Sequence, residues 1–346
     1  MTFTSAWRSP SNIALIKYWG KHGLQLPRNP SLSFTLSACH TVMQLTVTPD
    51  ADSPGLQVSY EGVPKPSFEP KINTFFSLVK NRFPWLSNAS VTIDSQNTFP
   101  HGAGIASSAS AMSALSLCLM DIHGQIHGGI TLQNSEWWQM ASEVARLGSG
   151  SACRSVYPVA SIWGQTPNAP ESSDFFGIPW EHEIAPVFKD YRDTILIVST
   201  AEKSVSSTAG HRLMEGLPYA ETRYAEARQN LIRLSEVMAT GTDLNAFIAI
   251  VESEALQLHA LMMSGKTPFI LMEPGTISLI KEIWRFRKET NIPVCFTLDA
   301  GPNVHLLYPT QYSPAIMDWI DSELAPYCAE GKYILDHVGA GPEKIS

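Results

Sequence analysis

The sequence is short of charge, of paired cysteines and of long apolar runs, and each shortage excludes a class of protein. Only 16% of its 346 residues are charged, and its lysines and arginines are scattered within a net charge of −8. The basic patch of a nucleic-acid binder is therefore missing. The five cysteines are widely spaced and form no CxxC pair, which argues against a disulfide framework and a zinc site. We expect buried thiols instead.

Signals for the membrane or for export are also missing. No stretch approaches the roughly 18 apolar residues that a membrane span requires. The N-terminal residues lack the basic and apolar pattern of a signal peptide. We therefore expect a cytoplasmic protein that binds neither nucleic acid nor membrane.

Apolar residues, by contrast, are plentiful enough for a large core. Hydrophobic residues make up 44% of the chain and aromatic residues 10%, as in globular proteins. A chain of 346 residues exceeds the usual size of a single core, so we expect two domains. A loop rich in proline, asparagine and serine over residues 165–174 favours a boundary near residue 185, with domains 1–185 and 186–346.

The apolar pattern predicts strands and helices in both halves. Alternating or β-branched runs predict strands over residues 42–48, 56–60, 90–94, 159–163, 194–199, 294–298 and 304–308. Helical spacing predicts helices over residues 108–122, 135–147, 219–238, 276–289 and 314–324. Ser135 is the expected N-cap of one helix, and Asp243 that of a further helix. The predicted fold class is therefore α+β.

A loop over residues 99–110 has the composition of a phosphate site. Glycines let the backbone approach an anion closely, and the N–H groups and dipole of the helix that follows favour negative charge. The residues concerned are Gly102, Ala103, Gly104, Ser107 and Ser108. The loop is neither a Walker A motif nor a dinucleotide fingerprint, because no lysine follows and a serine replaces the third glycine. A tight helix-packing loop is the alternative.

Residues 11–21 carry two lysines suited to a diphosphate. In a β-strand Lys17 and Lys21 would project to one side and Tyr18 to the other, unless the chain turns at Gly20. The alternative is a solvated edge strand, since lysines commonly occupy such edges.

Residues 146–155 form a third candidate for anion binding. Ser149 and Ser151 offer hydroxyl donors in a turn, and Arg154 offers a planar fork suited to carboxylate or phosphate. A plain connector with a structural ion pair is the alternative.

Asp299 is the best candidate for a general base. It ends an apolar strand just before Gly301 and Pro302, so its carboxylate is held rigidly at the edge of a sheet. The alternative is an aspartate that only accepts a hydrogen bond in a turn.

In combination these four segments resemble the motifs of the diphosphomevalonate decarboxylase family. Its superfamily also holds galactokinase, homoserine kinase, mevalonate kinase and phosphomevalonate kinase. The likeness runs through SPSNIALIKYWGK, LPRNPSLSFTL, residues 97–111, GSGSACRS, VSSTAG and TLDAGPN. It covers most of the chain up to about residue 310, and GSGSACR together with DAGPN is highly specific.

The resemblance implies a two-domain small-molecule kinase fold. The N-terminal part is like ribosomal protein S5 domain 2, the C-terminal part is ferredoxin-like, and the active site lies between them. The implied reaction uses ATP with Mg²⁺ to phosphorylate the 3-hydroxyl of mevalonate 5-diphosphate, after which carbon dioxide and phosphate leave to give isopentenyl diphosphate. The implied assembly is a homodimer.

The resemblance also implies roles for the matching residues. Asp299 orients or deprotonates the 3-hydroxyl, Arg154 holds the substrate carboxylate, and Lys17 stabilises charge at the reacting centre. Further substrate contacts are assigned to Asn12, Tyr18, Lys21, Ser149 and Ser151. Nucleotide binding is assigned to Asn97, Gly102, Ala103, Gly104, Ser107 and Ser108. No dedicated metal site is expected, although the hydroxyls of Ser107 and Ser108 could reach a magnesium ion held by the phosphates.

Departures from the family pattern concern nucleotide binding. His101 stands where the family more often has a small hydroxyl residue, and Ala201 and Glu202 weaken a lysine-rich lead that includes Lys203. A mevalonate 5-phosphate decarboxylase, a mevalonate 3-kinase and a non-catalytic ligand-binding paralogue stay open as alternatives. The complete set of Lys17, Arg154 and Asp299 favours full decarboxylation, and the failed fingerprint argues against a nicotinamide-dependent oxidoreductase.

Overall fold

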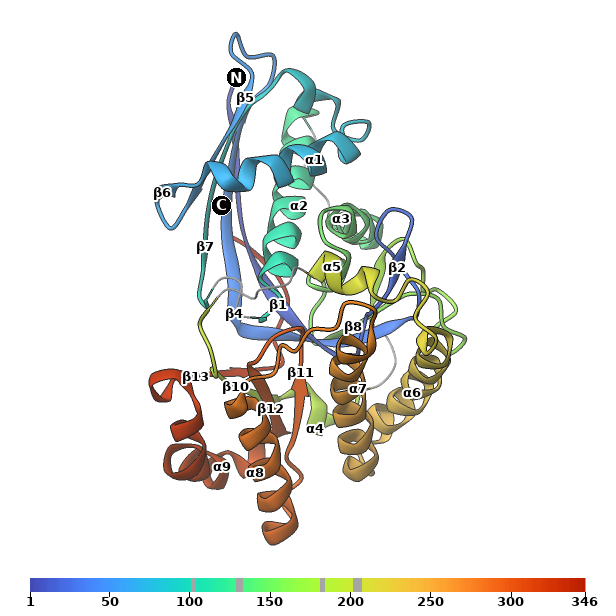
Figure 1. The fold of residues 1–346 in the computed structure, drawn as a ribbon. Helices are drawn as coiled ribbons and strands as arrows, with labels where there is room; N and C mark the ends of the chain where they lie inside the picture. Colours follow the sequence, from blue (N-terminus) through green and yellow to red (C-terminus); the bar gives the residue numbers. More distant parts are fainter. Residues whose placement is uncertain (101–103, 129–132, 181–183, 202–206, 346) are drawn as a thin grey trace.

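Two β-sheets, each built mainly from one half of the chain, organise the computed structural model (Figure 1). The structure describes residues 1–100, 104–128, 133–180, 184–201 and 207–345. Helices pack against both sheets, so the predicted α+β class is confirmed.

The first sheet has eight strands within the described residues, and its main path runs β14-β1-β4-β7-β5-β6. These strands are β1 (Phe3–Ile16), β4 (Ser31–Thr48), β5 (Gly55–Tyr60), β6 (Val63–Pro64), β7 (Ser90–Asn97) and β14 (Glu343–Lys344). The long antiparallel pair of β1 and β4 also carries β8 (Ala160–Trp163), which pairs in turn with β9 (Gly177–Pro179). One face packs against α1 (Glu69–Val79), α2 (Ser107–Ile126) and α3 (Ser135–Gly148) (Figure 1).

The second sheet is antiparallel, in the order β11-β12-β10-β13. Its strands are β10 (Tyr191–Leu196), β11 (Cys295–Leu298), β12 (Val304–Pro309) and β13 (Tyr333–His337). The helices of this half are α4 (Pro186–Lys189), α5 (Ser207–Arg212), α6 (Ala220–Thr240), α7 (Leu244–Ser264), α8 (Pro274–Thr290) and α9 (Ser313–Trp319). Because β14 pairs with β1, the last strand returns to the first sheet. The domain boundary near residue 185 stays a prediction.

Each predicted strand and helix corresponds to an element, but some limits differ. The strand predicted over 194–199 runs from Tyr191 to Leu196, because beyond Leu196 the Asn303 side chain, rather than a strand, bonds the backbone of Ser199. The helix predicted over residues 314–324 is an α-helix only as far as Trp319. It continues over Ile320–Leu324 as a π-helix, whose turns are wider.

The two predicted helix caps differ in outcome. Asp243 caps α7 as expected, since its carboxylate accepts the Ala246 N–H at 2.9 Å. Ser135 is the first residue of α3, and the cap is Asn134, whose side chain accepts the Trp137 N–H. All five cysteines are buried free thiols, as predicted.

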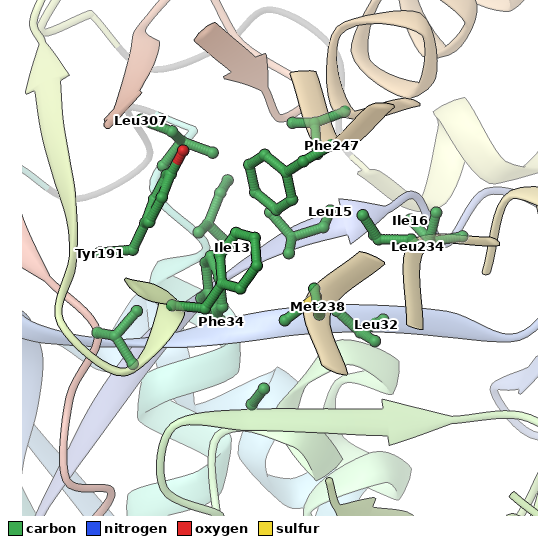
Figure 2. Packing of buried hydrophobic residues seen from close by; sticks show 14 of the residues in the cluster. Ile13, Leu15, Ile16, Leu32, Phe34, Tyr191, Leu234, Met238, Phe247 and Leu307 are labelled. Carbon is green, nitrogen blue, oxygen red and sulfur yellow. The ribbon is translucent and has the colours of Figure 1, made fainter. Parts of the chain in front are cut away.

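A single apolar cluster joins the two sheets (Figure 2). Ile13 of β1 and Phe34 of β4 meet Tyr191 of β10 and Leu307 of β12 there, and Phe247 of α7 fills the space between them. The rings of Tyr191 and Phe247 lie 5.3 Å apart. The two sheets are therefore held against each other by a continuous core.

One helix, α7, bears on the expectation that the chain does not cross a membrane. Helix α7 is long and apolar enough to cross a membrane by length and composition, yet 67% of its most apolar window is buried inside the protein. Such burial is typical of the core helix of a soluble protein.

A bulge in β4 depends on one buried carboxylate from the second half of the chain. The pairing of β1 with β4 shifts register between Pro10 and Asn12, which leaves Ser37, Ala38 and Cys39 unpaired with β1. Their N–H groups all donate to the Asp336 carboxylate, at 2.7 to 2.8 Å. Asp336 thus supplies the acceptors that the bulge has lost.

We expect Asp336→Asn to lower the free energy of unfolding by about 3 kcal/mol, because an NH₂ group would face backbone donors in a buried site. Urea unfolding of both proteins measures the change. Asp318→Asn, at an exposed position on α9, is the control. An equally small effect of both substitutions would contradict this account of the bulge.

Candidate active site

One pocket collects most of the predicted site residues. Its volume is about 370 Å³, within the roughly 300–1,000 Å³ that is usual for ligand sites. The predicted residues that line it are Lys17, Tyr18, Lys21, Gly104, Ser107, Ser108, Ser149, Ser151, Arg154 and Asp299. Four segments that are far apart in the sequence therefore meet at one place.

Four other predicted residues are not part of this lining. Asn12 is buried behind it, where its Nδ2 donates to Ser155 Oγ at 2.8 Å and to the Ser151 carbonyl at 3.2 Å. Asn97 ends β7 and accepts a hydrogen bond from Thr41 Oγ1. Gly102 and Ala103 lie outside the described residues. Their assigned roles stay predictions.

Lys17 and Asp299 form an ion pair at the centre of the pocket. The distance from Lys17 Nζ to Asp299 Oδ1 is 3.1 Å, and the lysine side chain is only 2% exposed. The expected alternation of Lys17, Tyr18 and Lys21 is wrong, because β1 ends at Ile16 and all three side chains line the same pocket. The edge-strand alternative fails as well, since Lys17 is buried.

Burial and neighbouring charges together shift the pKa values of both residues. Burial lowers the pKa of Lys17 more than the nearby Asp299 and Glu254 carboxylates raise it. Burial alone would raise the pKa of Asp299, but Lys17, His305 and Arg154 together bring it below its ordinary value. Asp299 is therefore ionised near neutral pH and accepts hydrogen bonds. Within the turn after β11, the Gly301 N–H donates to the backbone carbonyl of Asp299. The turn hydrogen bond is therefore accepted by the main chain and not by the Asp299 carboxylate.

Arg154 and Tyr18 present buried donors to the pocket. The Arg154 guanidinium is 3% exposed, donates through Nη1 to Ser31 Oγ, and forms no ion pair with a described residue. Its Nε and the Tyr18 hydroxyl have no hydrogen-bond partner in the part of the chain that the structure describes. Burial raises the pKa of Tyr18, so the phenol stays protonated. Both groups suit an anionic ligand.

The start of α2 forms the opposite wall. Ala106, at φ 49°, provides no side-chain cap, so no described side chain caps the first N–H groups of the helix. Ser108 Oγ lies 3.2 Å from Ser149 Oγ, which links this wall to the turn before Arg154. Gly104 has φ +83°, and a Cβ there would lie 3.2 Å from Gly301 Cα. The loop before α2 therefore packs directly against the turn that carries Asp299.

Some lining residues were not predicted from the sequence. Lys71 of α1 lines the pocket. Burial, followed by the positive charges of Arg212 and Lys71, lowers the pKa of Lys21. His211 packs its ring 4.4 Å from that of Tyr18, and its Nδ1 accepts the Gly20 N–H. Lys71 has no motif around it, and only the packing of α1 could reveal it.

His259 of α7 holds the backbone beside the ion pair. Its Nε2 donates to the Asp299 carbonyl oxygen at 3.1 Å. Burial lowers the pKa of His259 to about 4, so the ring is neutral at neutral pH.

Comparisons with known proteins show the family to which the chain belongs. Residues 9–174 match the model of the diphosphomevalonate decarboxylase-like N-terminal domain, and residues 194–342 match that of the mevalonate 5-diphosphate decarboxylase C-terminal domain. A diphosphomevalonate decarboxylase from Ganoderma lucidum is 32% identical over 336 residues, covering 90% of this chain and 80% of the relative. The chain belongs to the diphosphomevalonate decarboxylase family. The family resemblance seen in the sequence motifs is confirmed.

Other members of the diphosphomevalonate decarboxylase family also match most of the chain. The Rattus norvegicus diphosphomevalonate decarboxylase is 30% identical over 317 residues, 85% of this chain and 74% of the relative. The Staphylococcus aureus mevalonate diphosphate decarboxylase structure has a TM-score of 0.84 at 26% identity, covering 100% of this chain and 99% of that one. A structure described as MDDEF in complex with MVAPP, AMPPCP and magnesium has a TM-score of 0.83 at 27% identity, with both chains covered completely.

The buried neutral His259 predicts a pH dependence of stability. In the unfolded chain the histidine binds a proton below its ordinary pKa of 6.5, whereas in the folded protein it does so only below about 4. Stability is therefore fully present above pH 6.5 and is lost as the pH falls towards 4, by on the order of 3 kcal/mol. Urea unfolding across this range should show a steeper loss for the native protein than for His259→Gln, which keeps an N–H donor. Parallel curves would contradict the assignment.

Proposed function

We propose that this chain catalyses the ATP-dependent decarboxylation of mevalonate 5-diphosphate to isopentenyl diphosphate, with ADP, phosphate and carbon dioxide as the other products. One observation carries the proposal. The Lys17–Asp299 ion pair and the Arg154 guanidinium, which lacks an acidic partner among the described residues, line the same pocket as the start of α2. A base, a carboxylate receptor and a phosphate site are thereby combined.

Asp299 and Arg154 have complementary tasks in this reaction. Asp299 takes the proton of the 3-hydroxyl while that oxygen bonds to the γ-phosphorus of ATP and ADP leaves. The bond to the carboxyl carbon then breaks, its electron pair forms the new double bond, and phosphate departs with the electrons of the C–O bond. Arg154 orients the carboxylate more than it stabilises it, because tight stabilisation would oppose loss of carbon dioxide.

Lys17 stabilises the negative charge that develops on the substrate during both steps. Its ammonium lies 3.1 Å from the Asp299 carboxylate and in a buried site, where a positive charge acts strongly on developing negative charge. The proposed role is to orient Asp299 and to stabilise the phosphorylated oxygen as it leaves.

The diphosphate end of the substrate suits a second set of donors in the pocket. Tyr18, Lys21, Ser149 and Ser151 line it, and Lys71 adds a further positive charge. A diphosphate offers many acceptors, and charge-assisted hydrogen bonds to such groups are the stronger ones. These contacts favour the diphosphate over the monophosphate.

ATP with Mg²⁺ fits the start of α2. The uncapped N–H groups and the hydroxyls of Ser107 and Ser108 offer donors and oxygen ligands at the positive end of the helix dipole. No group of three His, Cys, Asp or Glu side chains that could bind a metal ion occurs among the described residues. Phosphate oxygens and water would therefore supply most of the magnesium ligands. When bound, magnesium neutralises phosphate charge. The structure described as holding AMPPCP and magnesium belongs to a relative of the same fold.

A cytoplasmic homodimer is the assembly that we propose from the family resemblance. Sedimentation of the purified protein tests the dimer directly.

The assay for this function measures ADP and carbon dioxide from ATP, Mg²⁺ and mevalonate 5-diphosphate. We expect equal amounts of both products, and in Asp299→Asn a fall in kcat of at least about 10³-fold, because the base is removed while shape is kept. Asp318→Asn is the control and should match the native rate.

Other outcomes would identify the alternatives. ADP without carbon dioxide would make the protein a 3-kinase, and faster turnover of mevalonate 5-phosphate would make it a monophosphate decarboxylase. Release of neither product would leave a ligand-binding protein.

A further inference from the structure

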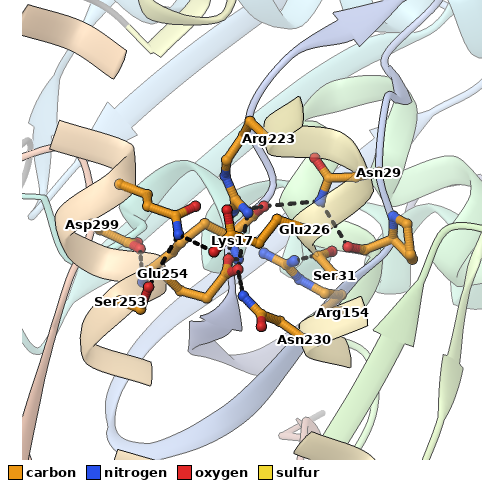
Figure 3. Close-up of polar contacts among 12 residues, drawn as sticks. Lys17, Asn29, Ser31, Arg154, Arg223, Glu226, Asn230, Ser253, Glu254 and Asp299 are labelled. Atoms are coloured by element: carbon orange, nitrogen blue, oxygen red, sulfur yellow. Dashed lines mark hydrogen bonds and ion pairs between the residues drawn. The ribbon is translucent and has the colours of Figure 1, made fainter. Parts of the chain in front are cut away.

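The backbone of Lys17 is held by side chains rather than by a strand partner (Figure 3). The strand β1 ends at Ile16, so Lys17 lies just beyond the ladder. Its N–H donates to Glu254 Oε2 at 2.8 Å. Its carbonyl oxygen accepts from Asn29 Nδ2 at 3.1 Å and from Arg223 Nη2 at 3.4 Å.

Glu254 and Arg223 form a buried ion pair at this point. Their side chains are 0% and 3% exposed, and two hydrogen bonds of 2.5 and 2.9 Å join them. Asn230 Nδ2 donates to Glu254 Oε1 at 2.8 Å. Neither member of the pair lines the pocket, so neither is placed to touch a ligand there.

Stability alone does not account for this arrangement. A buried ion pair is costly to desolvate and often adds no more stability than apolar residues of the same size. Helix α7 already has a second pair, Glu252 with Arg287, that joins it to α8. What distinguishes Glu254 is that its carboxylate is shared between Arg223 and the Lys17 N–H. Charge-assisted bonds of this kind are short and directional.

The same helix holds the other member of the central pair. Five residues after Glu254, His259 donates to the Asp299 carbonyl oxygen. Helix α7 therefore fixes the main chains of both Lys17 and Asp299, although the two come from different sheets.

We propose that the Arg223–Glu254 pair is a positioning clamp for Lys17, and that it sets the 3.1 Å distance between Lys17 Nζ and Asp299 Oδ1. The clamp acts on the rate through Lys17 and has no contact with substrate. It rests on the proposed function, because the position of Lys17 affects turnover only if Lys17 and Asp299 act on the substrate.

The double variant Glu254→Gln with Arg223→Met tests the clamp. Removing both charges together leaves no unpaired buried charge, so the protein is expected to fold. The shift of the lysine should lower kcat by about 100-fold and leave the KM for mevalonate 5-diphosphate within about 3-fold. A merely structural role would not separate kcat from KM in this way.

The control and a milder variant complete the experiment. Glu252→Gln with Arg287→Met removes the other ion pair of α7, which forms no hydrogen bond with a described residue of β1, and should keep the native kcat. Asn230→Ala removes one hydrogen bond to Glu254 and should lower kcat by about 3-fold to 10-fold. Urea unfolding confirms that each variant is folded.

The outcomes separate the clamp from the proposed function. If the native protein releases ADP and carbon dioxide and the folded double variant has native kcat, the clamp is wrong and the function stands. If the double variant does not fold, native kcat in Asn230→Ala overturns the clamp. An equal loss of kcat in the control pair would also overturn it. If the native protein releases neither product, the proposed function itself fails.

Discussion

The structure depends on the burial of one lysine charge beside one carboxylate. A charge in the interior is costly unless it is paired and hydrogen-bonded, and the Lys17 side chain is only 2% exposed. Its partner Asp299 follows 282 residues later and comes from the other sheet. The pair therefore exists only when the sheets are packed together, and the cluster around Tyr191 and Phe247 holds them so. Core packing is thus a condition for the chemistry.

Buried charges in this protein divide into two kinds. Asp336 and Glu254 are bonded to several groups of the chain itself, and they fix a β-bulge and the end of β1. Arg154 is as deeply buried and yet has no acidic partner in the described part of the chain. A charge whose partners are internal stabilises one conformation, whereas a charge left without a counterion favours an anionic ligand.

The glycines of the family motifs acquire a physical reason in this fold. Gly104 adopts φ +83° and lies so close to Gly301 that a side chain at Gly104 would press on its backbone. The loop before α2 therefore needs glycine where it meets the turn that carries Asp299. This contact joins two of the sequence motifs, residues 97–111 and TLDAGPN.

The sequence by itself determined the α+β class, the approximate place of each predicted strand and helix, and the four segments that meet in the pocket. Apolar periodicity, capping residues and short motifs are local, so a linear reading finds them. Tertiary structure alone decided that Lys17 turns out of its strand into the pocket, that Lys71 joins it, and that Glu254 holds the lysine backbone. These positions depend on contacts between distant segments, and the packing of the two sheets and α7, which no local pattern contains, brings those segments together.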